Sequence, residues 1–180
     1  MGQYYKPINT DDMSWFYAHE VDNNGLKLME HSYIGNMLCG AVMFRMTKGQ
    51  PWYMKPIVWA GDYYDEAGEI PYYKMVQEKI EPKEHEYLSM ADQHYCFIVN
   101  HTKREYYDCS KTKEIEGWKD CYINPLPLLT ALGNDRGGGD YRGKSMDKVG
   151  AWAGDILSIS LEEDGPPVGY EEVNYDFKEE

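Results

Sequence analysis

Trp59-Ala60-Gly61-Asp62 recurs as Trp152-Ala153-Gly154-Asp155, at an offset of 93 residues. The chain of 180 residues holds only five tryptophans, so chance is a poor explanation for this repeat. Further pairs occur in the same order at offsets of 88 to 92: Asn9 with Asn100, Gly25-Leu26-Lys27 with Gly117-Trp118-Lys119, and Asn36 with Asn124. A repeat on this scale predicts that the chain is an internal duplication.

Each unit carries the same order of local signals. Two short aromatic and β-branched runs separated by polar residues predict a hairpin: Tyr4–Asn9 with Trp15–His19, and Tyr95–Asn100 with Glu105–Cys109. Apolar residues then recur at helical spacing behind an asparagine suited to the N-cap: Met37–Met46 behind Asn36, and Leu126–Leu132 behind Asn124. A strand carries each tetrapeptide, over Pro56–Ala60 and over Ala151–Leu161.

The two units together predict an α+β fold with pseudo-twofold symmetry. Each unit has a hairpin, a short strand at the Gly-x-Lys, a helix and a strand, and each covers the apolar face of the other. The predicted boundaries are 1–65 for the first unit and 92–161 for the second. Residues 66–91 form an acidic connector with a helix over Tyr72–Ile80, and residues 162–180 form an acidic tail.

Charge separates the units from these two segments. The chain has a net charge of −13, of which residues 62–92 carry −6 and residues 162–180 carry −7. Residues 1–61 and 93–161 each contain equal numbers of acidic and basic side chains. So acidic a chain does not favour direct binding to nucleic acid, which needs clustered lysine and arginine.

Composition also predicts the compartment. No stretch of 18 apolar residues is present to span a membrane, and the N-terminus lacks the basic and apolar regions of a signal peptide. The four cysteines are too sparse for a disulfide scaffold and form no C-x-x-C pair. They are Cys39, Cys96, Cys109 and Cys121. A cytoplasmic protein is therefore expected, with Cys39 and Cys96 buried as small apolar side chains.

A glycine-rich stretch, residues 133–145, has no counterpart in the first unit. Its segment from Gly138 to Ser145 matches the letters of the P-loop, G-x-x-x-x-G-K-[ST]. A P-loop requires a strand before it and a helix after it, whereas a predicted helix precedes this stretch. A surface loop is the simpler interpretation, and the alternative is a loop that binds a phosphorylated small molecule through backbone amides and arginine side chains.

The residues of that ligand-binding alternative are Asp135, Arg136, Gly138, Gly139, Asp140, Arg142 and Lys144, joined by Asp62 and Asp155 from the tetrapeptides. The two tetrapeptide aspartates suit acid–base work or hydrogen bonds to a ribose. A turn in which Asp accepts from nearby backbone amides is the favoured interpretation of Gly-Asp. The five histidines form no H-E-x-x-H pattern, and no catalytic constellation stands out, so neither a metal nor a cofactor is expected.

Three stretches resemble an uncharacterised family of small proteins of bacteria and their phages or mobile elements. They are the N-x-T-K-x-E-Y pattern of Asn100–Tyr106, the Gly-Gly-Gly-Asp of residues 137–140 and the Trp-Ala-Gly-Asp of residues 152–155. The resemblance carries no activity and no catalytic residue over to this chain. It implies the unit boundaries and a cytosolic setting only.

Two functional hypotheses follow. The first is a non-enzymatic protein whose acidic segments and tyrosine-rich surfaces bind a basic protein, such as a host defence or nucleic-acid-handling enzyme that a phage-type inhibitor would block. The 17 tyrosines, against four phenylalanines, support it because tyrosine suits interfaces. The second is a small-molecule or nucleotide-binding protein, or an enzyme, that uses residues 133–145 and the seam between the units.

Overall fold

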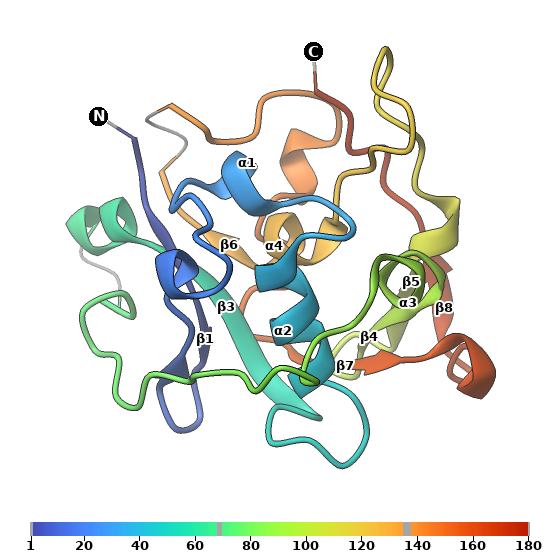
Figure 1. Ribbon diagram of the computed structural model, residues 1–180, viewed down its shortest axis with the longest axis horizontal. Coiled ribbons are helices and arrows are strands. Elements are labelled where there is room, and N and C mark those ends of the chain that lie inside the picture. The colour runs from blue at the N-terminus through green and yellow to red at the C-terminus, as the bar shows by residue number, and fades with distance from the viewer. Residues whose placement is uncertain (1, 68–69, 135–137, 180) are drawn as a thin grey trace.

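Eight strands form one mixed sheet in the computed structural model, which describes residues 2–67, 70–134 and 138–179. The strand order is β2-β1-β3-β7-β4-β5-β8, and β6 pairs separately with β3 (Figure 1). The protein therefore has an α+β fold with few helices, as expected. The helices α2 and α4 lie near each other in the middle of the molecule (Figure 1).

The first hairpin and the strand that follows it form one side of the sheet. β1 (Tyr5–Asn9) pairs antiparallel with β2 (Ser14–Trp15) on one edge and with β3 (Lys55–Gly61) on the other. Asn9 closes the hairpin because its Oδ1 accepts from the Asp11 amide at 3.0 Å. The predicted first hairpin is present, although its second strand is shorter than the aromatic run.

The second hairpin is built in the same way. β4 (Phe97–Asn100) pairs antiparallel with β5 (Glu105–Asp108) and with β7 (Ile156–Ser160). Asn100 Oδ1 accepts from the Lys103 amide at 2.9 Å. The sheet becomes continuous where β3 and β7 pair antiparallel through Lys55 and Pro56. From this junction outward, the strand order is β3, β1 and β2 on one side, and β7, β4 and β5, followed by β8, on the other side.

Two helices behind asparagine caps cover the core, as the sequence predicts. α2 (Met37–Arg45) begins where Asn36 Oδ1 accepts from two helix amides, and α4 (Pro125–Thr130) begins where Asn124 Oδ1 accepts from Leu126. Every residue of α4 is buried. The predicted second helix was too long, because the chain leaves it at Ala131 to form β6 (Ala131–Leu132), which pairs parallel with β3.

The remaining elements are short. Two are α-helices, α1 (Leu28–His31) and α3 (Met90–Tyr95), and β8 (Glu171–Val173) pairs parallel with β5. Five are 3-10 helices: η1 (Ala18–Glu20), η2 (Asp62–Ala67), η3 (Cys109–Lys111), η4 (Met146–Lys148) and η5 (Glu162–Asp164). Among the described residues, no helix is long and apolar enough to cross a bilayer.

One cluster of buried apolar side chains contains most of the core. It includes residues from both halves of the sheet, on either side of the β3–β7 junction. It includes Trp52, Trp59 and Trp152, whose side chains are fully buried. Trp59 and Trp152 therefore both lie in the core. Cys39 and Cys96 are also fully buried, as expected.

The alignment of the two tetrapeptides is wrong for this fold. Trp59 lies within β3, whereas Trp152 lies in the turn before β7. Trp52 is the residue that precedes β3 as Trp152 precedes β7, at an offset of 100 residues. The same four residue types lie at the end of a strand in the first case and in a turn in the second. Identity of residue type does not determine which backbone hydrogen bonds a segment makes.

Matched contacts support the pairing of Trp52 with Trp152. Trp52 Nε1 donates to Ser14 Oγ at 3.0 Å, and Trp152 Nε1 donates to Glu105 Oε2 at 3.2 Å. Ser14 and Glu105 are the first residues of β2 and β5. Each indole is therefore tied to the second strand of its own hairpin.

Three other local predictions are corrected. Residues 72–80 contain turns rather than a helix, and Gly25–Lys27 and Gly117–Lys119 contain no strand. Residues 162–180 are not a free solvated tail, because Phe177 is only 5% exposed and belongs to the core cluster. Counting charges missed the aromatic residues that stand between the acids and hold this segment against β5.

Candidate functional site

The glycine-rich stretch packs against the rest of the chain where it is described. Asp135 and Arg136 lie outside the described residues. Gly138 and Gly139 are exposed, and the Gly139 carbonyl accepts from the Met29 amide at 2.5 Å. Asp140 Oδ2 accepts from Gln3 Nε2 at 3.3 Å. The described part of the loop is therefore docked on the N-terminal strand and on the start of α1.

The local structure around Lys144 differs from that of a P-loop. The three-residue η4 follows Ser145, so no long helix points its amides at the loop. Lys144 Nζ lies 4.0 Å from Asp176 Oδ2, and Gly143 lies so close to the Lys178 carbonyl that a Cβ would collide with it. Arg142 is exposed, and its Nη1 donates to the Tyr141 carbonyl at 3.4 Å. The glycine at 143 thus serves close packing of two backbone segments.

Asp62 and Asp155 do not form a common site. Asp62 follows the end of β3, and its Oδ1 accepts from the Tyr4 amide at 3.0 Å. Asp155 lies beside the start of β3, where its carbonyl accepts from Ile57. The length of β3 therefore separates them, at about 3.3 Å per residue. Asp62 accepts from an amide 58 positions away in the chain and not from its own turn, and it lies near the Gln3 contact of the glycine-rich stretch.

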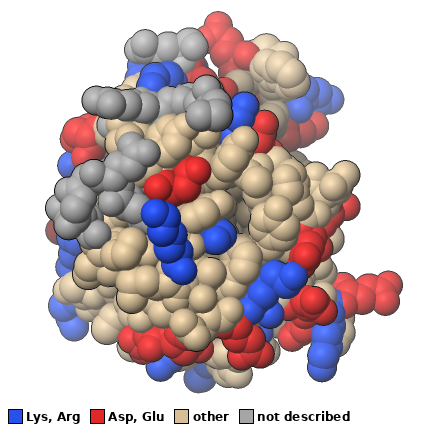
Figure 2. All heavy atoms as spheres, turned by 90° about the vertical axis from the view of Figure 1, so that its left-hand side faces the viewer, with Lys and Arg blue, Asp and Glu red and all other residues tan. Residues whose placement is uncertain are grey.

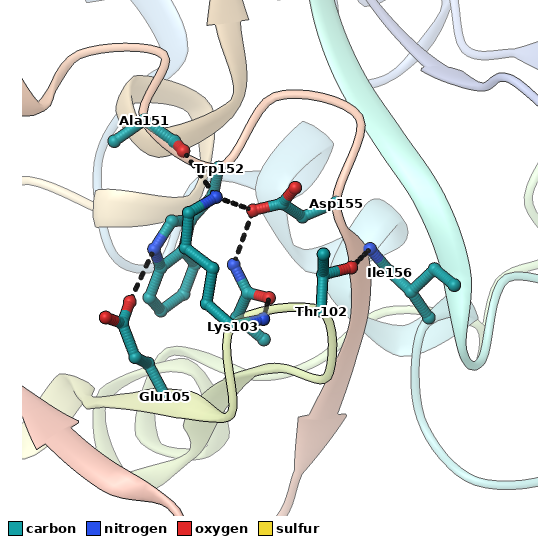
Figure 3. Close-up of polar contacts among 8 residues, drawn as sticks. Thr102, Lys103, Glu105, Ala151, Trp152, Asp155 and Ile156 are labelled. Carbon is teal, nitrogen blue, oxygen red and sulfur yellow. Dashed lines mark hydrogen bonds and ion pairs between the residues drawn. The ribbon is translucent and has the colours of Figure 1, made fainter.

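Asp155 instead joins Asn100 and Lys103 of the N-x-T-K-x-E-Y pattern to the second tetrapeptide (Figure 3). Its Oδ2 accepts from Asn100 Nδ2 at 2.8 Å and forms an ion pair with Lys103. Lys103 Nζ also donates to the Ala151 carbonyl at 3.1 Å, and Thr102 Oγ1 accepts from the Ile156 amide at 2.9 Å. These polar groups have partners within the network, so it acts as a brace between two loops.

A protruding loop carries the most exposed aromatic side chain that the structure describes. Residues 114–122 fold back on themselves, with the Ile115 amide donating to Cys121 and the Cys121 amide donating to Trp118. The Asp120 amide donates to Glu114 Oε1 at 2.8 Å. Trp118 stands near the tip of this loop and is 69% exposed. The hydrogen bonds of the loop thus fix the backbone that presents the exposed Trp118 side chain to solvent.

Two apolar hollows flank the Cys121–Tyr122 segment at the base of this loop, with volumes of about 340 and 450 Å³. We call the combined area the Trp118 surface. It is made of Tyr33, Ile115, Trp118, Cys121 and Glu179 on one side, and of Met90, Ala91, His94, Tyr95, Asp120 and Tyr122 on the other. The His94 ring contacts the rings of Tyr95 and Tyr122, with centroids 4.9 and 4.6 Å apart.

Carboxylates lie beside two tyrosines of the Trp118 surface, in a region that also carries Lys113, Lys119 and Lys178. Burial raises the pKa of Tyr33 to about 12, and the charge of Glu179 adds to the rise. Burial likewise raises the pKa of the Tyr122 hydroxyl, with contributions from Glu114 and Asp120. The nearby Lys178 is paired with Glu116 at 3.5 Å. A cationic group that approaches these rings would therefore be favoured.

A different face carries both acidic and basic side chains. Figure 2 looks at the side of the molecule that carries β1 and η2. Asp and Glu side chains lie round its margin and near its middle, with lysine and arginine side chains among them.

Sequence reasoning did not select the residues of the Trp118 surface. Trp118 entered only as the partner of Leu26 in an alignment, yet Leu26 is packed against the core while Trp118 is exposed. The excess of tyrosine was the available signal, but it did not indicate which rings reach the surface. His101, which lies in a separate pocket, was also missed because its partners are distant in sequence.

No family model matches the chain, and neither the curated proteins nor the solved structures contain a significant match to it.

Proposed function

We propose that this protein is a binding protein that engages a basic protein partner through the Trp118 surface. The observation that carries the proposal is Trp118 itself, which is 69% exposed on a loop held by its own hydrogen bonds. Tryptophan and tyrosine dominate the residues on which protein–protein affinity depends. A preformed loop also loses little conformational entropy on binding.

Charge supports the choice of a basic partner. Glu114, Asp120 and Glu179 border the aromatic rings, and the whole chain carries −13. Arginine side chains would gain from both features, because a guanidinium stacks on an aromatic ring and pairs with a carboxylate. An inhibitor of a nucleic-acid-handling or defence enzyme remains the kind of protein that this surface fits, since such enzymes carry basic surfaces.

The partner can be captured at the tip of the loop. A photoreactive phenylalanine derivative in place of Trp118 should cross-link the partner in cells of the source organism, whereas the same group in place of Met75 should not. Met75 is 44% exposed and belongs to the connector, away from the loop. The cross-linked protein is then purified and its affinity is measured.

The affinity of the purified partner tests the proposal. Trp118→Ala should weaken binding about 30-fold or more, as expected for a central aromatic contact, while Met75→Ala should change it by less than about threefold. Asp120→Asn keeps a residue that tolerates the left-handed backbone at this position and removes one charge. It should weaken binding in low salt and have less effect in high salt. Equal affinity of Trp118→Ala and the wild type would reject the proposal.

We also infer that the two sides of the sheet arose by internal duplication and are related by a pseudo-twofold axis between β3 and β7. The outward strand order from that junction and the paired roles of Asn9 with Asn100 and Trp52 with Trp152 support this inference. The resemblance to a family of small bacterial and phage proteins stays part of the same proposal. A cytoplasmic setting is supported by the free thiols of the four cysteines.

A further inference from the structure

A pocket of about 260 Å³ lies against β4 and β7. Ser158 and Ser160 alternate with core residues along β7 and therefore face away from the core cluster. Ser158 is paired with Val99 across the ladder, and both are buried on this covered face. The chain after β7 folds over this face. The pocket is lined by Lys48, Tyr53, Val99, His101, Ser158, Ile159, Ser160 and residues 164–167.

A chain of hydrogen bonds runs through the pocket. Ser158 Oγ lies 2.7 Å from His101 Nε2, and His101 Nδ1 lies 3.0 Å from the Tyr170 hydroxyl. In the tautomer that carries its proton on Nδ1, the imidazole donates to Tyr170 and accepts the hydroxyl proton of Ser158. This is the order of nucleophile, base and orienting group that activates a serine.

The surroundings keep the histidine ready to act as a base. Burial lowers the pKa of His101, so its imidazole is neutral at pH 7. The Tyr170 ring is fixed between His101, which meets it edge to face at 5.7 Å, and the Arg104 guanidinium, which lies 4.8 Å from its centroid. The base therefore has a defined orientation through its second nitrogen.

The brace in Figure 3 fixes the backbone that carries His101. The His101 amide donates to the Ile156 carbonyl at 2.8 Å, and the next residue, Thr102, accepts from the Ile156 amide. Asn100 and Lys103 on either side are held by Asp155. The polar residues around His101 in the N-x-T-K-x-E-Y pattern thus serve the loop, while His101 faces the pocket. A rigid supporting shell of this kind is what a reacting group needs.

We propose that Ser158 is a nucleophile activated by His101 and that the pocket accepts small carboxylic esters, an activity separate from the proposed binding function. Ser158 Oγ forms a bond to the ester carbonyl carbon while its proton moves to His101 Nε2. The ester C–O bond then breaks, and the leaving alcohol takes that proton. Water then adds to the acyl carbon while His101 Nε2 takes one of its protons. The bond from that carbon to Ser158 Oγ breaks, His101 returns the proton to Oγ, and the released acid loses its own proton to solvent as a carboxylate.

The pocket suits a short acyl chain. Its volume lies below the range of pockets that hold drug-sized ligands, and Tyr53 and the two prolines at residues 166 and 167 provide apolar walls. Lys48 lines the same pocket and supplies positive charge for the oxygen anion that develops on the carbonyl. Tyr170 is a positioning residue because it acts on the reaction through His101.

Labelling of the full-length protein with diisopropyl fluorophosphate tests the proposal. The expected result is one covalent adduct, located on Ser158 by peptide mass spectrometry and absent from Ser158→Ala. His101→Gln should slow labelling about 100-fold or more, as loss of a general base does. Ser110→Ala, which removes an exposed hydroxyl bonded to Asp108 outside this pocket, should be labelled at the wild-type rate.

Hydrolysis of p-nitrophenyl acetate gives a second measurement. Its first part uses only the wild-type protein, before and after labelling, and so does not depend on whether the variants fold. The wild type should release p-nitrophenol with turnover, and prior labelling should abolish it. Tyr170→Phe should reduce the rate less than His101→Gln and should shift the pH profile, which a structural role alone would not do. No adduct on the folded wild type, an adduct elsewhere, or labelling insensitive to His101→Gln would overturn the proposal.

Discussion

In each half of the chain, one segment connects the hairpin to the helix that follows it. The two connecting segments occupy equivalent positions along the chain but differ in how much of each is buried. In the first half, residues 16–36 wrap into the core and bury Phe16, Val21, Leu28 and His31. In the second half, residues 109–124 include a protruding loop with an exposed Trp118. Both connections supply core residues, but the second contributes only Cys109 and Ile123 to the buried cluster and leaves its loop exposed.

His31 shows how completely the first connection is buried. Its Nδ1 bonds the Gly25 carbonyl at 2.9 Å, and its Nε2 accepts from Trp59 Nε1 at 2.9 Å. Both nitrogens are satisfied in the neutral form, so the imidazole joins the connection to β3. The second connection has its buried polar residue, Asn124, at its last position, where it caps α4, and it presents its largest side chain to water.

The largest expected effect contrasts one tryptophan from each environment. Trp59→Ala should lower the free energy of unfolding by about 3–5 kcal/mol, because it opens a cavity and leaves His31 without its donor. Trp118→Ala should change the same quantity by no more than about 0.5 kcal/mol. Urea unfolding of both variants measures the difference. Equal losses would mean that the Trp118 loop is part of the core.

The free energy of unfolding should depend on pH through His31, which lies in the first connection. Burial lowers the pKa of His31 to about 4 from its usual 6.5, so the unfolded chain binds a proton more readily. Stability from this group is complete above pH 6.5 and is lost as pH falls toward 4, by about 3 kcal/mol in total. His31→Gln can keep both hydrogen bonds without titrating.

The test compares the free energy of unfolding of the two proteins between pH 7 and pH 4, since carboxylates titrate in both. The wild type should lose more stability than His31→Gln over this range. Parallel curves would show that His31 does not stay neutral in the folded protein.

These contrasts also indicate what the sequence could predict. Hairpins, caps and the buried cysteines follow from local signals, because Asn36 and Asn124 act on residues two or three positions away. The placement of Trp59 and Trp152 in different elements depends on hydrogen bonds between distant strands. For the same reason the contact of Ser158 with His101, 57 residues apart, carries no local signal. Exposure of Trp118 depends on which neighbours cover it.

A smaller effect compares the ion pairs at the two hairpin corners. Asp155 is largely buried between Lys103 and Asn100, whereas Asp11 forms a solvent-exposed pair with Lys55 at 3.5 Å. Asp155→Ala should cost about 1–3 kcal/mol, because it leaves two donors without their acceptor. Asp11→Ala should cost less than about 1 kcal/mol. Thermal unfolding of the two variants measures both, and a larger cost for Asp11→Ala would contradict the comparison.

The smallest effects are expected in the glycine-rich stretch, at the two described cations that a phosphate-binding loop would use. Arg142 and Lys144 are exposed, and Lys144 is only 4.0 Å from Asp176 in a solvated pair. Arg142→Ala and Lys144→Ala should therefore each change the free energy of unfolding by about 0.5 kcal/mol or less. Gly143→Ala, between them, should be clearly destabilising because its Cβ would meet the Lys178 carbonyl. Melting curves with and without Mg·ATP complete the test. If nucleotide stabilises the wild type and Lys144→Ala removes that stabilisation, the loop is a ligand site. If nucleotide leaves the melting curves of the wild type, Arg142→Ala and Lys144→Ala unchanged, the loop serves packing alone.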